Sequence, residues 1–315
     1  MKVLIVASYN KKRYAPFIVE QAEALRQAGC EIDWYGVQGK GIAGYLKAIP
    51  HLRAKIREFK PDIIHAHYGL SCLLANLATR YVPVVSTYHG SDINLKKNRK
   101  FSRLAMWLSA WNIFVSKRNV DIAQLKKHWS LIPCGVALSD EQLMTREQAR
   151  KELGWKATDK KVLFAGAFDT RAKNAPLAKA TMALFEDVDL IELKGYSRSE
   201  VNRLMCAANC LLMTSHTEGS PQVIKEAMAC GCPIVSVDVG DVAERTEGVD
   251  GCFVVPSEEL RDKREELIEE LAKALKNAIV FDGRTNGREK ILETGLTNEQ
   301  VAQKIIDIYK RVCEF

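Results

Sequence analysis

Short apolar runs alternate with amphipathic helical stretches along the first part of the chain, and this alternation constrains the fold more than any other feature. The apolar run at 3–7 precedes a helical pattern over 16–27, and the run at 31–35 precedes another over 43–58. The order continues with apolar runs at 62–65, 82–87, 111–115 and 129–132. Strands that alternate with helices form parallel sheets, because a parallel connection needs a long crossover. The pattern therefore predicts an α/β domain.

The alternation begins again after a polar segment, 136–160, which is helical in pattern and lacks a strand signal. Further strands are expected at 161–166, 189–193, 210–214, 233–237 and 252–255, and the chain from 258 to 315 is almost wholly helical in pattern. A chain of 315 residues exceeds the size at which one core usually splits. We therefore expect two doubly wound, Rossmann-like domains that face a cleft, with ligands beyond the carboxyl ends of the strands.

The expected boundaries follow from this pattern. The first domain covers 1–135, a connector covers 136–160, the second domain covers 161–295, and a C-terminal helix at 296–315 packs back toward the first domain.

Charge and cysteine content limit the function classes. Nine cysteines are an odd number, scattered among apolar residues, which favours reduced thiols in a cytoplasmic protein without a metal site. The net charge of +7 comes without a long basic stripe or an aromatic-rich binding motif, so nucleic acid is not expected as a partner. An anionic ligand and an anionic membrane surface both explain the sign of the charge.

The stretch HTEGSPQVIKEAMACGCP at 216–233 places a turn between a strand and a helix. Ser220 is expected to be the N-cap and Pro221 the first helical residue, with Gly231 just past the end of the helix. Free backbone amides at a helix start bind phosphate, and Gly219 lets the backbone come close to a ligand. This turn is therefore a candidate phosphate site.

Two glutamates stand on either side of this turn. A phosphate would repel carboxylates, whereas an ionised carboxylate accepts hydrogen bonds from two neighbouring hydroxyls. Glu226 is placed to hold a ribose diol and Glu218 a sugar hydroxyl, with a diphosphate between them, which together describe a nucleotide sugar. The alternative is that Glu218 is a solvated loop residue and Glu226 an exposed helix residue.

The segment 217–240 resembles the E-x7-E signature of retaining GT-B glycosyltransferases of the GT4 type (group 1). Other segments also resemble motifs of that family, namely DIIHAHYG at 62–69, STYHGSD at 86–92, IPCGV at 132–136, FAGAFDTRAKN at 164–174 and LKGY at 193–196. Three departures stand out: SYNKKRYAP replaces the family's paired glycines at 8–16, Ala167 stands at a usual arginine, and the stretch before Gly195 is short. The resemblance implies a GT-B fold with a reduced C-terminal domain.

The family's functional residues are carried over onto matching positions. The resemblance implies catalytic roles for His89, Glu218, Lys173 and Arg171, the last supplying the charge missing at Ala167. It implies donor binding by Glu226, Gly219, Ser220, Pro221, Gln222, Val223, Gly166 and Tyr196. The acceptor-side candidates are His67, Asp92 and Arg13. No metal or other cofactor is expected.

Several candidates keep a second interpretation. Asp92 either touches the donor or caps the turn at Gly90, and Tyr196 either stacks on the base or packs. His65 and His67 flank one residue at a strand end and are expected on opposite faces, with His67 facing the cleft.

Together these features predict a metal-independent, retaining transferase that moves a sugar from a nucleoside-diphosphate sugar to a glycan or lipid-linked acceptor, in bacterial surface polysaccharide synthesis. A nucleotide-sugar epimerase of the same fold and a non-catalytic nucleotide-sugar-binding protein are the alternatives. The cationic and aromatic segment KKNRKFSRLAMWLSAW at 96–111 fits either a helix on anionic lipid, at the inner face of the plasma membrane, or a helix packed on the domain.

Overall fold

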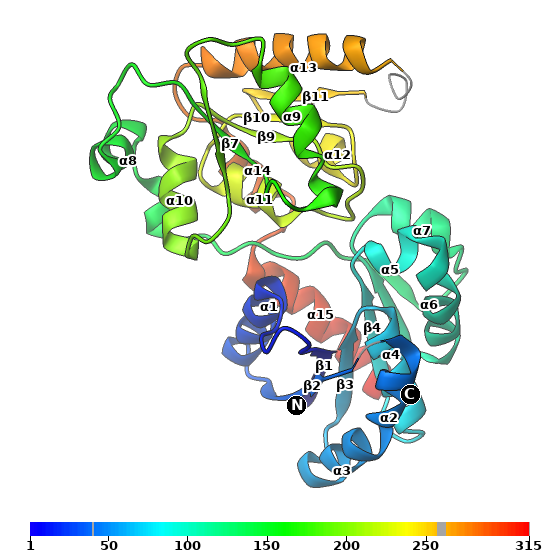
Figure 1. Cartoon of the computed structure of the whole chain (residues 1–315). Helices are drawn as coiled ribbons and strands as arrows, with labels where there is room; N and C mark the ends of the chain where they lie inside the picture. The colour runs from blue at the N-terminus through cyan, green and yellow to red at the C-terminus, as the bar shows by residue number, and fades with distance from the viewer. Residues whose placement is uncertain (40, 257–262, 315) are drawn as a thin grey trace. The chain divides into compact units, whose positions relative to one another are not determined.

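The computed structural model describes residues 1–39, 41–256 and 263–314, and the chain forms two compact units (Figure 1). Unit 1 consists of residues 1–137 and 296–315, and unit 2 of residues 138–295. The segment 136–160, expected to be a connector, belongs to unit 2 from Leu138 onward. It holds the 3-10 helix η1 (Asp140–Leu143) and α8 (Arg146–Leu153), each opened by a capping box, and both contact α10 (Arg198–Ala207).

Unit 1 is built on a six-stranded parallel sheet in the order β2-β1-β3-β4-β5-β6. The strands are β1 (Lys2–Ser8), β2 (Glu31–Val37), β3 (Ile63–His67), β4 (Val84–Tyr88), β5 (Trp111–Phe114) and β6 (Trp129–Leu131). Every residue of β3 and β4 is buried, as expected of central strands covered on both faces. The order reverses between β1 and β3, the point where ligands bind in such sheets.

Helices cover both faces of this sheet. Alternate residues of β1 point to opposite sides, so Val3 and Ile5 pack with α1 (Pro16–Gln27) and α15 (Asn298–Cys313). Leu4 and Val6 pack on the other face with α3 (Ile49–Phe59), α4 (Gly69–Ala78) and α6 (Lys96–Leu108). The remaining helices are α2 (Gly41–Lys47), α5 (Ser91–Asn94) and α7 (Lys117–Ala123). The C-terminal helix α15 thus completes the core of unit 1.

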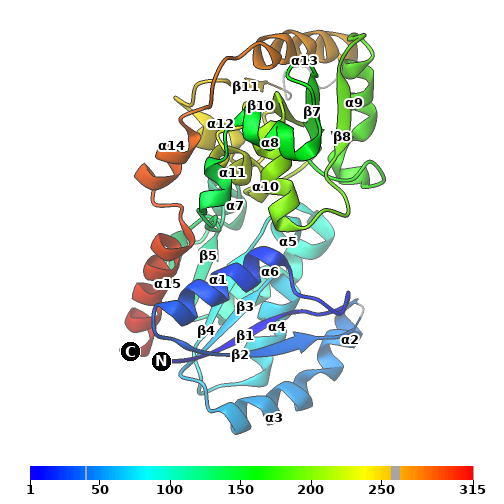
Figure 2. The ribbon, with the colours of Figure 1, turned by 90° about the vertical axis from the view of Figure 1, so that its left-hand side faces the viewer.

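Unit 2 is built on a five-stranded parallel sheet in the order β11-β10-β9-β7-β8. Figure 2 shows β8 at one edge of this sheet and β11 at the other. The strands are β7 (Lys161–Phe164), β8 (Asp189–Glu192), β9 (Cys210–Met213), β10 (Ile234–Val237) and β11 (Cys252–Val255). Its other helices are η2 (Arg171–Lys173), α9 (Ala175–Met182), α11 (Gln222–Ala229), α12 (Val242–Thr246), α13 (Arg264–Ile279) and α14 (Gly287–Glu293). The expectation of two Rossmann-like sheets and a helical C-terminal tail is confirmed; residues 258–262 and 315 of that tail lie outside the described residues.

None of the helices within the described ranges is both long enough and apolar enough to cross a membrane.

Candidate active site

In unit 2, two loops meet at the carboxyl ends of the neighbouring strands β7 and β9. The Thr214 hydroxyl donates to the carbonyl oxygens of Lys173 and Asn174 at 3.0 and 3.1 Å. The His216 amide donates to the carbonyl oxygen of Ala172 at 2.9 Å. These bonds fix the loop that carries Glu218 against the η2 segment. The structure therefore brings Lys173 and Glu218 together.

Lys173 and Glu218 form an ion pair, with 2.7 Å between Nζ and Oε1. Gly166 explains how the lysine reaches this position. A Cβ on Gly166 would meet Lys173 Cγ at 2.9 Å, and its φ of +152° is one that other residues rarely adopt. The lysine stem therefore lies across a position that only glycine leaves open. Arg171 is exposed, and its side chain makes no hydrogen bond or ion pair with another described residue.

The helix after the turn begins one residue later than expected. Pro221 is the N-cap of α11 and Gln222 the first helical residue, and no side chain caps this end. The predicted N-cap at Ser220 is therefore wrong. The Ser220 hydroxyl lies 3.2 Å from the Nζ of Lys225, a fully buried lysine one turn into the helix, and this ammonium donates to it. Gly231 adopts a φ of +58° just past the helix, as predicted.

Glu226 lies on α11, 8% exposed, and its Oε1 forms an ion pair with Arg198, the first residue of α10. Sequence reasoning missed Arg198. The one signal for it is Ser197 followed by Glu200, a capping box that marks the start of α10 beside the loop after β8. Glu226 is thus a buried, ionised carboxylate with a cation beside it. Such a carboxylate accepts a hydrogen bond from a ligand hydroxyl group and repels an anion.

A third loop, after β10, packs against the turn that contains Gly219. Gly240 has a φ of +68°, and a Cβ there would meet the Gly219 carbonyl oxygen at 2.6 Å. The next residue, Asp241, is buried and lies 3.2 Å from Arg245 Nε. Burial raises the pKa of Asp241, and the nearby positive charge of Lys225 opposes that rise. Gly240 ends the segment 217–240 singled out in the sequence, but the sequence assigns neither it nor Asp241 a supporting role, because both lie a whole strand beyond the turn.

In unit 1, three histidines gather at the carboxyl ends of β3 and β4. His65 and His67 stack at 4.4 Å between ring centroids, so they lie on the same face and the prediction of opposite faces is wrong. Residues two apart in a strand point the same way. His65 contacts the hydroxyls of Tyr309 at 2.6 Å and Thr87 at 2.7 Å. Burial lowers its pKa to about 3, so His65 is a neutral structural residue.

His89 sits beyond His67 in this cluster. Its Nε2 lies 3.1 Å from Nδ1 of His67, and its Nδ1 lies 3.6 Å from the sulfur of Cys134. Its ring also packs against Phe17 and Tyr68, at 4.9 and 4.6 Å between centroids. Burial, and then the neighbouring histidines, lower the pKa of His67 well below its usual value. His67 is therefore neutral at neutral pH and hydrogen-bonded to His89.

Asp92 is buried and holds the loop around His89. Its carboxylate accepts hydrogen bonds from the amides of Gly69, His89 and Gly90 at 3.1, 3.1 and 2.9 Å. Burial raises its pKa to about 6, although these amides oppose the rise. Of the two interpretations of Asp92, the structure supports the loop cap.

The remaining candidates are less constrained. The side chain of Arg13 is exposed and makes no hydrogen bond or ion pair with another described residue. Tyr196 follows Gly195, which has a φ of +85°, and is 43% exposed, without an aromatic contact among the described residues. The structure thus leaves both available to a ligand without assigning them one.

Each unit also matches a known protein family. Residues 31–140 match the model described as Glycosyltransferase Family 4, and residues 144–277 match the model described as Glycosyl transferases group 1. Two Rossmann-like domains with these matches define a glycosyltransferase of the GT-B class. The chain belongs to the group 1 glycosyltransferases of family 4.

Relatives in sequence and structure agree with this assignment. The chain is 27% identical over 244 residues to the putative teichuronic acid biosynthesis glycosyltransferase TuaC of Bacillus subtilis, a match that covers 65% of this chain and 62% of that relative. It is 27% identical over 314 residues to an uncharacterized glycosyltransferase of Methanocaldococcus jannaschii, covering 87% of this chain and 82% of the relative.

Two solved structures show the same fold. Sucrose-phosphate synthase from Thermosynechococcus elongatus has a TM-score of 0.78 at 17% identity, over 99% of both chains. Anabaena HepE in complex with UDP has a TM-score of 0.70 at 16% identity, over 99% of this chain and 100% of that one.

Proposed function

We propose that this glycosyltransferase moves a sugar from a nucleoside-diphosphate sugar to a hydroxyl of a glycan or lipid-linked acceptor, with retention of configuration and without a metal ion. The observation that carries the proposal is the charge arrangement around the start of α11. Lys173 pairs with Glu218 on the loop before the helix, and Arg198 pairs with Glu226 on the helix itself. Two cations from other segments, suited to phosphate, are thus paired with the two carboxylates that flank the start of α11 and are suited to hydroxyls.

Each part of the donor is bound by a different set of these groups. Lys173 and the amides of Gly219, Ser220, Gln222 and Val223 hold the diphosphate; Pro221 has no N–H and shapes the turn. Glu226 accepts hydrogen bonds from the ribose, and Glu218 from the sugar. HepE was solved with UDP and with UDP-glucose, which makes UDP the first nucleotide to test here.

The proposed reaction is a front-face substitution. The bond between the anomeric carbon and the diphosphate oxygen breaks, and the acceptor oxygen forms a bond to the same face of that carbon. The acceptor proton passes to the leaving phosphate, so the products are a glycoside and a nucleoside diphosphate. Lys173 and the helix amides stabilise the charge on the leaving group, which supplies the cationic role that a metal plays elsewhere. His89 contributes an imidazole ring for hydrogen bonding to the reacting sugar.

Calorimetric titration of UDP, GDP, ADP and CMP into the wild type and into Glu226→Ala tests the donor site. We expect one diphosphate to bind the wild type and to lose affinity in the variant. If none binds, or if the variant binds as well as the wild type, the two glutamates do not form a donor clamp.

Incubation with donor alone separates the transferase from its alternatives. We expect slow hydrolysis of the donor, and transfer only when acceptor extract is added, with a rate that EDTA does not change. An epimerised donor would instead indicate an epimerase, and tight binding without turnover a sensor. Because TuaC is named for teichuronic acid biosynthesis, extracts of bacterial surface polysaccharide and its lipid-linked precursors are the acceptors to test first.

A further inference from the structure

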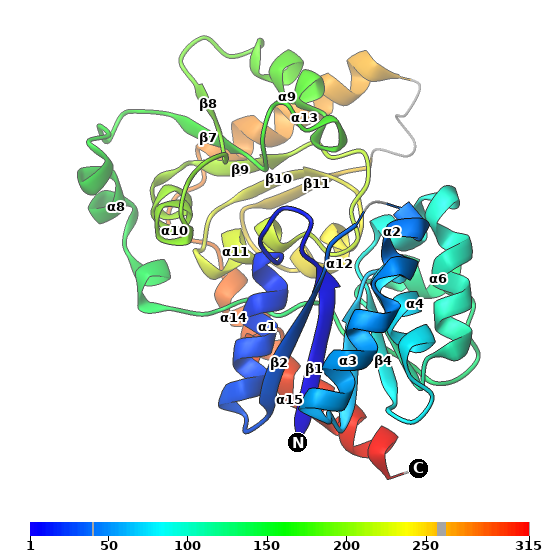
Figure 3. The same ribbon diagram turned by 60° about the horizontal axis from the view of Figure 1, so that its bottom comes forward.

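Unit 1 carries an apolar groove lined by residues of α2, α4 and α6. These three helices lie on the sheet face opposite α1 (Figure 3). The groove has a volume of about 230 Å³ and its lining is apolar, including Ile42 and Leu46 from α2, Leu70 and Leu74 from α4, and Phe101 and Leu104 from α6. Leu46 and Leu104 on its rim are 45% and 46% exposed. This surface is separate from the residues placed in the reaction.

The exposed side of α6 extends this apolar surface. Trp107 is 80% exposed. All five tryptophans lie in described parts of the chain, and the other four are partly buried. Leu108 beside it is 37% exposed. Trp111 falls both in the segment 96–111 and in the strand expected at 111–115; it begins β5 and contacts Arg311. The apolar surface therefore ends with α6.

The same helix is strongly cationic. Lys96, Lys97, Lys100 and Arg103 are exposed, and within the described residues none of them pairs with a carboxylate. The helix contains no Asp or Glu. Arg99 differs, because it donates to the carbonyl oxygens of Ile93 and Asn94 and so serves the fold. Four cations thus stand beside exposed aromatic and aliphatic side chains.

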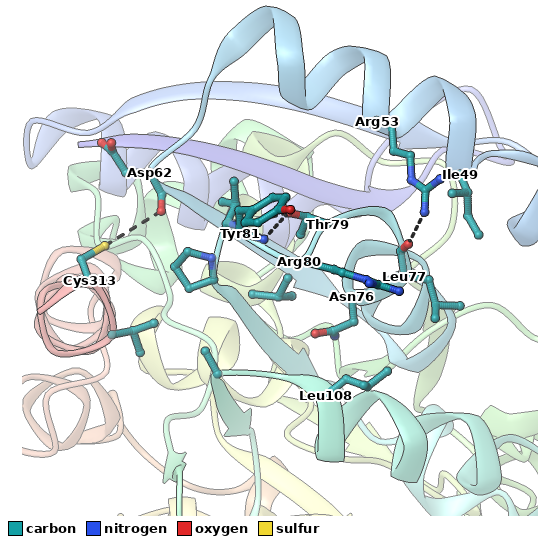
Figure 4. Close-up of a pocket in the computed structure, with 15 residues that line it drawn as sticks. Ile49, Arg53, Asp62, Asn76, Leu77, Thr79, Arg80, Tyr81, Leu108 and Cys313 are labelled. Atoms are coloured by element: carbon teal, nitrogen blue, oxygen red, sulfur yellow. Dashed lines mark hydrogen bonds between the residues drawn. The ribbon is translucent and has the colours of Figure 1, made fainter. Parts of the chain in front are cut away.

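A second hollow continues this surface toward the amino ends of the strands (Figure 4). It has a volume of about 1110 Å³ and shares Leu77 with the apolar groove, while Leu108 lines it from α6. Arg53 and Arg80 lie on its wall. Arg53 donates to the Leu77 carbonyl oxygen, whereas the exposed Arg80 side chain makes no hydrogen bond or ion pair with another described residue. The hollow therefore adds apolar side chains and two arginines to this surface, together with one carboxylate, that of Asp62.

We propose that this face of unit 1, formed by α2, α4 and α6, docks on an anionic lipid bilayer. Trp107, Leu104 and Leu46 would enter the interface, and the lysines and arginines would meet the lipid phosphates, a combination typical of interfacial helices. A second copy of the chain is the poorer occupant, because a self-complementary contact would bring the same cations against each other. The docking does not depend on the proposed donor site.

Co-sedimentation with vesicles tests the proposal. We expect the full chain to bind vesicles that mix phosphatidylcholine with phosphatidylglycerol, to bind pure phosphatidylcholine at least tenfold more weakly, and to show a blue shift of tryptophan emission on binding. Trp107→Ser should abolish most of the shift and weaken binding about tenfold. Val280→Ser removes an apolar side chain that is 77% exposed in unit 2, and should change neither.

The charges are tested with a matched pair of variants. Changing Lys96, Lys97, Lys100 and Arg103 to glutamine should weaken binding by about fivefold for each charge removed. Changing Lys151, Lys156, Lys273 and Lys276 to glutamine removes the same charge from exposed positions of unit 2 and should have little effect. Equal losses in both variants, equal binding to neutral vesicles, or no vesicle binding at all would overturn the proposal. Calorimetry with nucleotide and no vesicles reports the donor site independently.

Discussion

Lys173 and Glu218 are 45 residues apart in the chain, yet the lysine Nζ donates to the glutamate Oε1 at 2.7 Å. Their side chains are 24% and 19% exposed, so the pair is open to a ligand. Because a partly exposed ion pair contributes little to stability, the pairing has a larger consequence for the site. It holds a cation for phosphate and a carboxylate for a sugar hydroxyl at one point.

Replacing either partner should separate two functions. Glu218→Gln leaves the charge of Lys173 uncompensated, so affinity for the nucleoside diphosphate should stay equal or rise, while transfer falls at least tenfold. Lys173→Met removes a charged hydrogen bond and should lower diphosphate affinity by about ten- to a hundredfold. Calorimetry and initial rates measure the two effects. Equal loss of diphosphate affinity in both variants would show that the ion pair has a structural role only and that the two residues do not bind separate parts of the donor.

Gly166→Ala should displace Lys173, because the new Cβ would meet the lysine Cγ at 2.9 Å. We expect diphosphate affinity to fall at least tenfold. Gly154→Ala is the matched control, since Gly154 also has a positive φ, +69°, but has no atom within 4 Å of an added Cβ. That control should cost about 1 kcal/mol of stability from backbone strain and leave affinity unchanged. Similar affinities in the two variants would mean that Gly166 does not position the lysine.

Gly240→Ala tests the support behind the donor turn. An added Cβ would meet the Gly219 carbonyl oxygen at 2.6 Å, so the turn must shift. We expect loss of donor affinity together with a lower melting temperature. Gly248→Ala has a nearly equal φ, +73° against +68°, and open space around the new Cβ. Calorimetry on both variants separates the effect of the contact with Gly219 from the backbone strain of a positive φ. An unchanged affinity in Gly240→Ala would show that the turn tolerates the shift.

The sheets could be predicted from sequence because their buried strands read as continuous apolar runs. β3 and β4 are buried along their whole length, and both were recognised. The Ser220 cap failed for a local reason, since the buried Lys225 occupies the hydroxyl that a cap would use. The partner of Glu226 was missed because Arg198 lies 28 residues away, on another helix. Propensity and spacing carry no information about such pairs.

Glu226 should hold the ribose, and Arg198 should act through it. We expect Glu226→Ala to lower affinity for the nucleoside diphosphate by about ten- to a hundredfold. A 2′-deoxy nucleotide should bind the wild type more weakly than its ribose counterpart, and the two should bind Glu226→Ala alike. Arg198→Ala should retain part of this discrimination, because the carboxylate remains. If the variant without Glu226 still discriminates between the two sugars, the ribose is held elsewhere.

Asp92 should make stability fall with rising pH. Its pKa in the folded protein is about 6, above the ordinary value of 3.8. A raised carboxyl pKa means that the folded state holds its proton more tightly, so this contribution is complete below pH 3.8 and is lost as pH rises through 6. The shift corresponds to about 3 kcal/mol.

Comparison with Asp92→Asn isolates the pH-dependent contribution of Asp92 to the free energy of unfolding. Denaturant unfolding of both proteins between pH 4 and 7 should show the wild type losing stability relative to the variant as pH rises, because the variant has no carboxyl group to ionise. The other ionisable groups are common to both proteins and cancel in the difference. A difference that stays flat across this range would mean that the amides of Gly69, His89 and Gly90 compensate the burial of the carboxylate fully, and that the loop around His89 does not respond to pH.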